Sequence, residues 1–133
     1  MLEVSDRLEI HELLARVGHI IDDQEWERLP EVIAEDFISD ATAVGYPRCE
    51  GLHAVVESWS NPRRRADGHH WTNVVLTELN ETTVRAISKG LSVYGGSEAH
   101  ALVHEDVIVR TADGWRIARR VTRFRKAHPT DAR

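Results

Sequence analysis

Residues 68–79 mark the point at which the chain changes from helical spacing to alternation, and they read Gly68-His69-His70-Trp71-Thr72-Asn73-Val74-Val75-Leu76-Thr77-Glu78-Leu79. Side chains in a strand alternate between two faces. One face is therefore expected to carry His69, Trp71, Asn73, Val75, Thr77 and Leu79, and the other His70, Thr72, Val74, Leu76 and Glu78. Whichever face is interior takes one histidine with it. Because the pKa of imidazole lies near neutrality, that histidine is a candidate proton carrier.

Three more strand-like segments follow, at about residues 83–94, 98–110 and 115–124. The breaks between the four segments, Asn80-Glu81, Gly95-Gly96 and Ala112-Asp113-Gly114, are all turn formers. Short connections make consecutive strands neighbours, so we expect a four-stranded antiparallel meander over residues 69–124.

The first half of the chain shows helical spacing instead. A first helix is expected over residues 5–22, with Asp6 and Glu9 as a capping box and a buried face of Ile10, Leu13, Leu14, Val17, Ile20 and Ile21. Asp22 ends this helix at the edge of the apolar arc. An acidic residue there opposes the helix dipole, which makes it a poor stabilising terminus and a candidate functional group.

Shorter elements are expected between the first helix and the sheet. A second helix is predicted from Trp26 to Ile33, with Pro30 in its first turn. A short strand over 37–43 follows it. The last element before the sheet is a short helix that begins at Gly51. Its inward residues are expected to be Leu52, Val55, Val56 and Trp59. A chain in which helices come before a run of strands is typical of an α+β fold. We therefore expect a cone-shaped α+β fold in one domain, residues 1–133, ordered to about 126, with the first helix across the concave face of a strongly curved sheet.

Composition narrows the function classes. The chain has 133 residues, 41% hydrophobic and 29% charged, and a net charge of −5, which argues against a nucleic-acid partner. The arginine clusters at 63–65 and 116–125 are interpreted as solvated faces, with a local anion site as the open alternative. Cys49 is the one cysteine, and no signal peptide or membrane-length apolar run is visible, so a cytoplasmic protein without membrane partners is expected.

The third strand of the meander has apolar residues on both faces. Alternation alone favours as core the face of Ala99, Ala101, Val103, Glu105, Val107 and Val109, because the opposite face is interrupted by His100, His104 and Asp106. Two apolar faces on one strand need more cover than a small domain provides, so a homo-oligomer, dimer or trimer, is expected. His100 and His104 would lie ~13 Å apart along a strand, too far to share a metal. We expect no metal and no cofactor.

Several of these residues, in this order, resemble the SnoaL-like branch of the nuclear-transport-factor-2-like superfamily, which includes scytalone dehydratase, bile-acid 7α-dehydratase and hexachlorocyclohexane dehydrochlorinase. The carriers of the resemblance are Asp6–Ile10 with Leu13-Leu14, Asp22 with Trp26, the opening of the 69–73 strand, and residues 106–115. The resemblance implies a pocket aspartate at Asp22 and a histidine that pairs with it. The following Thr72-Asn73 favours His69 for that histidine, whereas a spacing count from Asp22 favours His70, and both stay open.

The resemblance also implies pocket positions at Leu102 and His104. Two departures affect the expected proton donor: Val17 stands where some relatives carry a tyrosine or lysine, and His104 where the third strand commonly carries a tyrosine. His104, Tyr94 or water would then supply the proton. Further candidates for contact with a substrate are Trp26, Trp71, Ser92, Tyr94 and His100.

Two functions follow as hypotheses. The first is a cofactor-independent lyase, isomerase or cyclase that uses an Asp22–histidine dyad on a small, largely apolar substrate such as a polyketide, a steroid or an aromatic compound. The second is a non-catalytic ligand-binding or oligomerisation module, since this fold also forms the partner subunit of ring-hydroxylating dioxygenases. An epoxide hydrolase is disfavoured because its acid–arginine–acid pattern is not evident.

Overall fold

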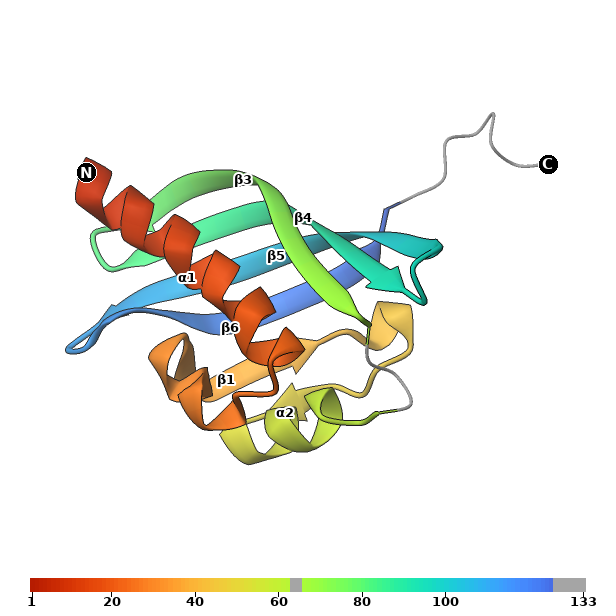
Figure 1. Cartoon of the computed structure of the whole chain (residues 1–133). Helices are drawn as coiled ribbons and strands as arrows, with labels where there is room; N and C mark the ends of the chain where they lie inside the picture. The colour runs from red at the N-terminus through yellow and green to blue at the C-terminus, as the bar shows by residue number, and fades with distance from the viewer. Residues whose placement is uncertain (63–65, 126–133) are drawn as a thin grey trace.

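Six strands form one open, curved sheet in a computed structural model that describes residues 1–62 and 66–125 (Figure 1). The strand order is β2-β1-β6-β5-β4-β3. The strands are β1 (Ile33–Asp40), β2 (Cys49–Glu50), β3 (Gly68–Asn80), β4 (Thr83–Tyr94), β5 (Glu98–Thr111) and β6 (Gly114–Phe124). The predicted antiparallel meander is confirmed as β3–β6. The sequence did not reveal that β1 pairs in parallel with β6, which makes the sheet mixed rather than antiparallel throughout.

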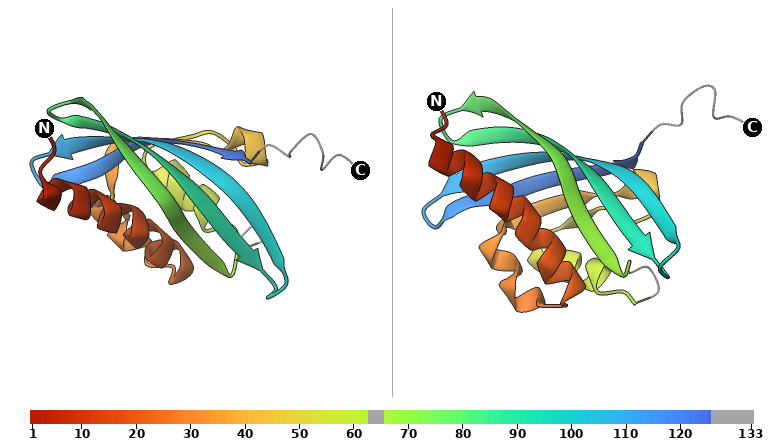
Figure 2. Two further views of the ribbon diagram at one scale, coloured as in Figure 1. Left: turned by 90° about the horizontal axis from the view of Figure 1, so that it is seen from above. Right: turned by 45° about the horizontal axis from the view of Figure 1, so that its top comes forward.

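Helix α1 (Val4–Asp22) lies across the concave side of the sheet, as both views in Figure 2 show. Its predicted apolar face is confirmed, because all six of those side chains are buried. They pack in one core with strand residues that include Phe37, Val84, Ile108, Trp115 and Ile117. The capping box is shifted by one turn from the prediction, and it joins Glu3 to Asp6. The fold class predicted from the sequence, helices on a cone-shaped curved sheet, is therefore correct.

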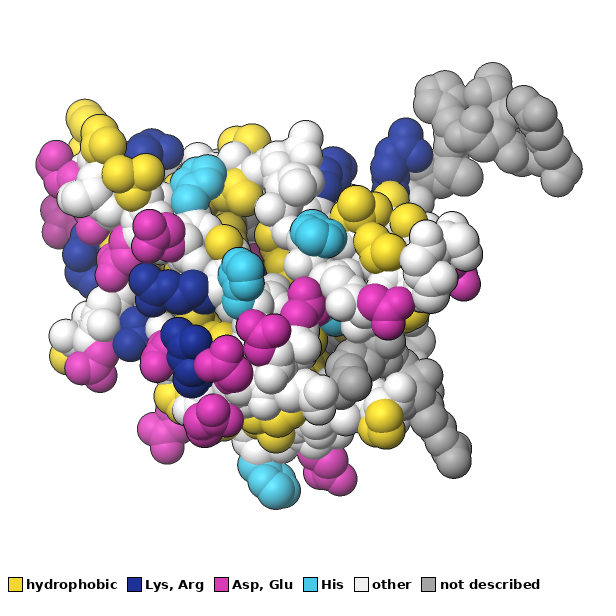
Figure 3. All heavy atoms as spheres, viewed as in Figure 1, with side chains coloured by type: hydrophobic (Ala, Val, Ile, Leu, Met, Phe, Trp, Pro, Cys, Tyr) yellow, Lys and Arg dark blue, Asp and Glu magenta, His cyan; other side chains and the backbone are white. Residues whose placement is uncertain are grey.

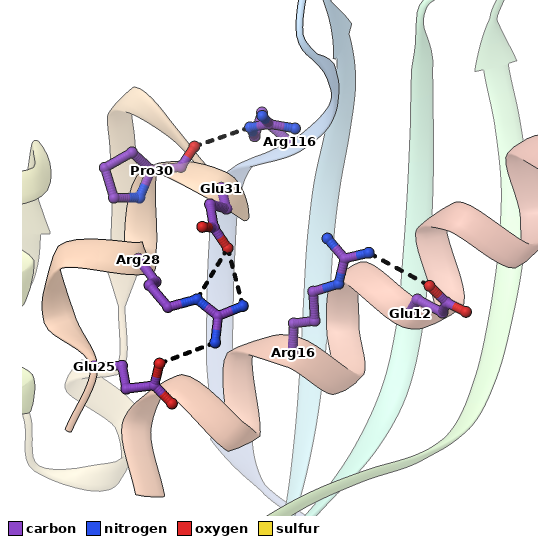
Figure 4. A network of polar contacts seen from close by, with 7 residues as sticks. All are labelled: Glu12, Arg16, Glu25, Arg28, Pro30, Glu31 and Arg116. Carbon is purple, nitrogen blue, oxygen red and sulfur yellow. Dashed lines mark hydrogen bonds and ion pairs between the residues drawn. The ribbon is translucent and has the colours of Figure 1, made fainter. Parts of the chain in front are cut away.

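The segment after α1 differs from its prediction. It forms a 3-10 helix, η1 (Trp26–Glu31), and Ile33 already begins β1. Pro30 has no backbone N–H, which favours a short helix at this point. The Pro30 carbonyl accepts a hydrogen bond from Arg116 of β6, and exposed ion pairs join Arg28 to Glu25 and Glu31 (Figure 4). The hydrogen bond from Arg116 ties η1 to the sheet, whereas exposed pairs of this kind add little stability.

The end of the sheet beyond β1 is covered by α2 (Leu52–Trp59) and by the short helix η2 (Thr42–Val44). Val55 is fully buried, and Trp59 meets Phe37 edge to face with ring centroids 5.9 Å apart. The four inward positions predicted for this helix are confirmed, since Leu52, Val56 and Trp59 also pack against the core. Helix α2 thereby closes one side of the space beneath the concave face.

A bulge in β3 corrects the alternation predicted for residues 69–79. Pairing with β4 shifts between Thr72 and Val75, and Asn73 has a positive φ of 55°. The extra residue reverses the faces beyond it. His69 and Trp71 face the interior before the bulge, but Val74 and Leu76 face it afterwards, and Val75 is exposed. Asparagine tolerates this left-handed conformation better than most residues.

The face of β5 that packs in the core is the opposite of the one predicted from alternation. His104, Asp106 and Ile108 are buried on the concave side, whereas Ala99 and Ala101 are exposed on the convex side. Polar residues are buried here because each has a partner on β6, which hydropathy alone does not reveal. The prediction from alternation was therefore wrong for this strand.

The surface seen in Figure 3 mixes acidic and basic side chains around α1, without one large basic field. Within the described ranges, no helix is long and apolar enough to cross a membrane. The arginine cluster at 63–65 and the tail expected after residue 126 lie outside the described residues.

Candidate functional site

A pocket of about 110 Å³ opens on the concave side of the sheet, beside the C-terminal end of α1. Its apolar walls come from Ile21, Val44, Trp59, Trp71 and Leu102. The hydroxyl-bearing residues of the lining are Ser39, Tyr46, Ser92 and Thr122, with the Asn61 amide near them. Three basic side chains complete it: His69, His104 and Arg120. Five strands and two loops thus bring polar groups to one small space, and three helical segments contribute apolar walls.

Asp22 binds His69 through both the backbone and the ring. The His69 backbone N–H donates to Oδ2 of Asp22 at 3.1 Å, and Nδ1 of the ring lies 2.6 Å from Oδ1. About a quarter of the Asp22 side chain and a fifth of the His69 side chain are exposed. The carboxylate therefore fixes the position of β3 and the orientation of the imidazole together.

This contact determines which ring nitrogen of His69 is free. An ionised carboxylate only accepts hydrogen bonds, so the proton in the Asp22–His69 contact belongs to Nδ1. In the neutral ring, Nε2 then carries a lone pair and can accept a proton. A carboxylate on the other nitrogen fixes this tautomer and the orientation of the ring. This arrangement is chemically able to act as a general base.

Gly18 allows α1 to approach β3 closely enough for this contact. A Cβ at position 18 would lie 2.9 Å from the His69 carbonyl oxygen and 3.1 Å from Cζ3 of Trp71. Asp22 follows one helical turn later, on the same side of α1. The absence of a side chain at Gly18 therefore helps to bring the Asp22 carboxylate within reach of His69.

The rings of His69, Trp71 and His104 form a row along the pocket. Ring centroids are 6.2 Å apart for His69 and Trp71 and 5.2 Å apart for Trp71 and His104, with interplanar angles of 22° and 28°. The guanidinium carbon of Arg120 lies 4.8 Å from the Trp71 ring. Trp71 therefore contacts all three basic side chains, and it was predicted as a candidate contact to substrate.

His104 is buried, and its Nδ1 lies 2.9 Å from the Thr122 hydroxyl oxygen. Its ring occupies the space that a side chain at Gly90 would fill. Burial, and then the charges of Arg120 and His69, hold the pKa of His104 well below its usual value of 6.5. His104 is consequently neutral at physiological pH and can serve as a hydrogen-bonding group rather than as a cation.

Arg120 forms a buried ion pair with Asp106 behind the pocket wall. Nε donates to Oδ1 at 2.7 Å and Nη2 to Oδ2 at 2.9 Å, and the Arg120 side chain is only 3% exposed. Sequence analysis missed Arg120, because it belongs to an arginine-rich run interpreted as a solvated face. That interpretation is correct for the exposed Arg119 and Arg123 but wrong for Arg120. The signal was its β-strand position on the same face as Thr122.

Comparison with known proteins decides the family. A family model for the SnoaL-like domain matches residues 2–121. The chain belongs to the SnoaL-like family. A relative in Mycobacterium tuberculosis, named only as an uncharacterised protein, is 31% identical over 127 residues, which cover 90% of this chain and 85% of the relative.

Solved structures place this SnoaL-like chain in the nuclear-transport-factor-2-like fold. A protein of Novosphingobium aromaticivorans, provisionally named as a scytalone dehydratase, has a TM-score of 0.71 and 18% identity. The match covers 93% of this chain and 89% of that protein. LinA has a TM-score of 0.75 and 20% identity, with coverage of 91% and 89%. At these identities the likeness concerns the fold.

The SnoaL-like pocket includes some of the predicted site residues and not others. His69, His104, Trp71, Ser92 and Leu102 line it, and Asp22 reaches it through His69. His70 is exposed and faces away from that side of β3, so the structure brings His69 and not His70 to Asp22.

Four further candidates lie outside the pocket lining. Val17 is fully buried in the core beneath α1, and Trp26 packs against the same core. Tyr94 and His100 contact each other with ring centroids 5.0 Å apart, and Nε2 of His100 lies 2.7 Å from Glu98. These four residues follow the predicted strand and helix faces but miss the pocket, since a face extends further than the cavity on it.

Residues from connecting segments were also missed. Val44 lines the pocket from η2, Tyr46 from the loop between η2 and β2, and Asn61 from the loop after α2. Loops carry no periodicity, so their positions follow only from the tertiary fold. Tyr46 is the hydroxyl-bearing aromatic residue at this wall, in place of the predicted Tyr94.

Within the described residues, no three histidine, cysteine, aspartate or glutamate side chains gather closely enough to hold a metal ion. The two histidines of the pocket belong instead to the row with Trp71 and Arg120.

Proposed function

We propose that this protein is a cofactor-independent enzyme that moves protons on a small molecule in the pocket, with His69 as general base and Asp22 as the group that orients it. The observation that carries the proposal is the 2.6 Å contact between His69 Nδ1 and Asp22 Oδ1. The two residues lie 47 positions apart on different elements, and His69, held by Asp22, lines the pocket.

The reaction begins when Nε2 of His69 removes a proton from a carbon acid. The electron pair of the broken C–H bond moves toward an electron-withdrawing group of the substrate, where negative charge develops. Arg120 and the neutral His104 lie along the same wall and can stabilise that charge by hydrogen bonds and by their dipoles or charge. Such preorganised groups act strongly in a site with apolar walls.

The second half of the reaction follows one of two routes. The imidazolium of His69 returns its proton to another carbon, which gives an isomerisation. Alternatively, the electron pair of the broken C–H bond forms a C=C bond while a leaving group departs with the pair of its own bond to carbon, which gives an elimination. With Val17 packed in the core, that position contributes no donor to the pocket. The lining groups that can donate a hydrogen bond to a leaving oxygen include Tyr46, Ser92 and one member of the hydrogen-bonded pair of His104 and Thr122.

Exchange of carbon-bound hydrogen for deuterium tests this proposal without knowledge of the product. The protein is incubated in D₂O with a panel of small ketones, enones and halogenated rings, and loss of C–H signals is followed by proton NMR. We expect exchange or elimination for at least one class of compound. His69→Gln is expected to lower that rate ~10²–10⁴-fold, as for loss of a general base.

His70→Gln is the matched control, because His70 is the exposed neighbour on the other face of β3. Its rate is expected to equal that of the unmodified protein. Equal losses in both variants, or no turnover of any panel member, would contradict the enzymatic proposal. A ligand-binding module on the same scaffold would then be the better account.

A further inference from the structure

We infer that the substrate is a compact carbonyl compound of about one six-membered ring, whose oxygen lies toward Arg120 while its acidic C–H lies toward His69. This inference rests on the proposed function, because it assigns the substrate oxygen and the acidic C–H bond to the two ends of the same pocket. It narrows the range of polyketide-, steroid- and aromatic-like substrates that the sequence suggested.

The volume of the pocket limits the size of the substrate. At about 110 Å³ it is smaller than a cavity of about 150 Å³ that holds one benzene molecule. Ligand pockets for drug-sized molecules are several times larger, at roughly 300–1,000 Å³. A steroid or a fused polyketide would therefore extend well beyond the walls, and one ring, partly at the open side of the pocket, is the largest unit that this volume suits.

The lining of the pocket favours an acceptor oxygen. His69, His104 and Arg120 line it, and no carboxylate does among the described residues. Asp22 and Asp106 instead lie behind the basic groups, each hydrogen bonded to one of them. At the Arg120 end the ligand therefore meets a positive charge and N–H donors, which suits a carbonyl or enolate oxygen and disfavours a protonated amine. The lowered pKa of His104 is consistent with a positive charge at this wall, since the charge of Arg120 is one of the causes of that shift.

The order of the strands separates the two ends. His69 is on β3, at one edge of the sheet, and Arg120 is on β6, three strands away. Both side chains nevertheless reach the ring of Trp71. A flat molecule of one ring's width can therefore present a C–H bond to His69 and an oxygen to Arg120 at the same time. A carbonyl with its acidic carbon in the same ring has this arrangement.

Binding of fluorinated ring compounds, followed by fluorine NMR, tests the inference without catalysis. 4-Fluorophenol presents a ring and one oxygen, and its phenolate resembles a cyclic enolate. Fluorobenzene lacks the oxygen, 4-fluorobenzylamine carries a cation, and 6-fluoro-2-naphthol adds a second ring. We expect 4-fluorophenol to bind about tenfold or more tightly than each of the others, as one charge-assisted hydrogen bond allows. The bound phenol should also ionise at lower pH than the free phenol.

The binding site is located from the NMR signals of the protein. The indole N–H of Trp71 and the His69 ring signals should shift with 4-fluorophenol. Equal affinity for fluorobenzene or for the amine would overturn the assignment of an oxygen site, and equal affinity for the naphthol would overturn the size limit. Shifts confined to residues away from the pocket would overturn both.

Two variants separate this inference from the proposed function. Asp22→Asn is expected to lose proton exchange and to keep the preference for 4-fluorophenol, because Asp22 does not line the pocket. The double variant Asp106→Asn with Arg120→Gln removes both charges of the buried pair together and should lose most of that preference. If it fails to fold, the ligand series on the unmodified protein still decides the inference. Normal ligand preference without exchange in the unmodified protein would contradict only the proposed function.

Discussion

Gly18 of α1 lies directly against the backbone carbonyl of His69 on β3, with room for a hydrogen atom but not for a methyl group. A Cβ there would also touch the ring of Trp71. The one residue that permits this approach thus lies one helical turn before Asp22, whose carboxylate holds the His69 ring. The position of the His69 imidazole depends on how closely the helix and the strand pack.

Replacing Gly18 by alanine is therefore expected to push α1 away from β3. In an exposed helix the change would stabilise by up to about 1 kcal/mol. Here overpacking, which costs ~1–3 kcal/mol, is expected to outweigh that gain. Urea denaturation should show a lower free energy of unfolding, and proton-transfer activity should fall with it. His19→Ala, at the exposed neighbour, should change neither; an unchanged or more stable Gly18→Ala would refute the packing argument.

Much of the fold was predictable from the sequence because it depends on local pattern. The apolar spacing of α1 and the turn residues between β3, β4, β5 and β6 each identify their own element. The parallel pairing of β1 with β6 was not predictable in this way, since it joins segments that lie far apart in the chain. The bulge at Asn73 was also missed, because alternation assumes two faces without an extra residue.

The candidate site was predictable where chemistry is unusual for its place in the chain. Asp22 is an acidic residue at the C-terminal end of a helix, where it opposes the helix dipole, and His69 is a polar residue at the start of an apolar strand. Arg120 was missed because burial of an arginine depends on a partner, Asp106, that local sequence does not identify. Tyr46 was missed for another reason, since it reaches the pocket from a loop without periodicity.

The buried pair of Asp106 and Arg120 predicts a specific pattern of stabilities. Asp106→Leu alone leaves an unpaired buried guanidinium, and we expect it to cost about 3–5 kcal/mol. Arg120→Met added to it should recover most of that loss, because an apolar pair replaces the charges. Urea denaturation of the two single variants and the double variant measures the coupling. Additive losses in the double variant would show that the two charges do not stabilise each other.

His104 predicts a dependence of stability on pH. Its pKa is lowered in the folded protein, so below about 6.5 the unfolded chain binds more protons at this residue than the folded chain. Its contribution is fully present above that pH and is lost as the pH falls through the lowered pKa of the folded state. Denaturation at about pH 7.5 and pH 5.5 should show a smaller loss of stability in His104→Gln than in the unmodified protein. His53→Gln, at an exposed position of α2, is the control and should keep the full loss.

The convex face of the sheet leads us to propose that the protein forms a homo-oligomer, a dimer or a trimer. Leu91 is 41% exposed there, with Ala101 opposite it on β5 and Ala99 on the same face, and Val75, which is 65% exposed, lies further along the sheet opposite Ile87. Apolar side chains grouped in this way indicate an interaction surface. Light scattering at tens of micromolar should give a mass above 15.1 kDa. Leu91→Glu should reduce it, whereas Leu8→Glu on the exposed side of α1 should not; a monomeric unmodified protein would contradict the proposal.

The most direct test of the account is the tautomer of His69, measured by ¹⁵N–¹H NMR of the imidazole rings at about pH 8, above the ordinary pKa of histidine. The account predicts a proton fixed on Nδ1 and a bare Nε2, with loss of this fixed tautomer in Asp22→Ala and no change in Asp23→Ala. A proton on Nε2 in the unmodified protein, or the same spectrum in Asp22→Ala, would contradict it.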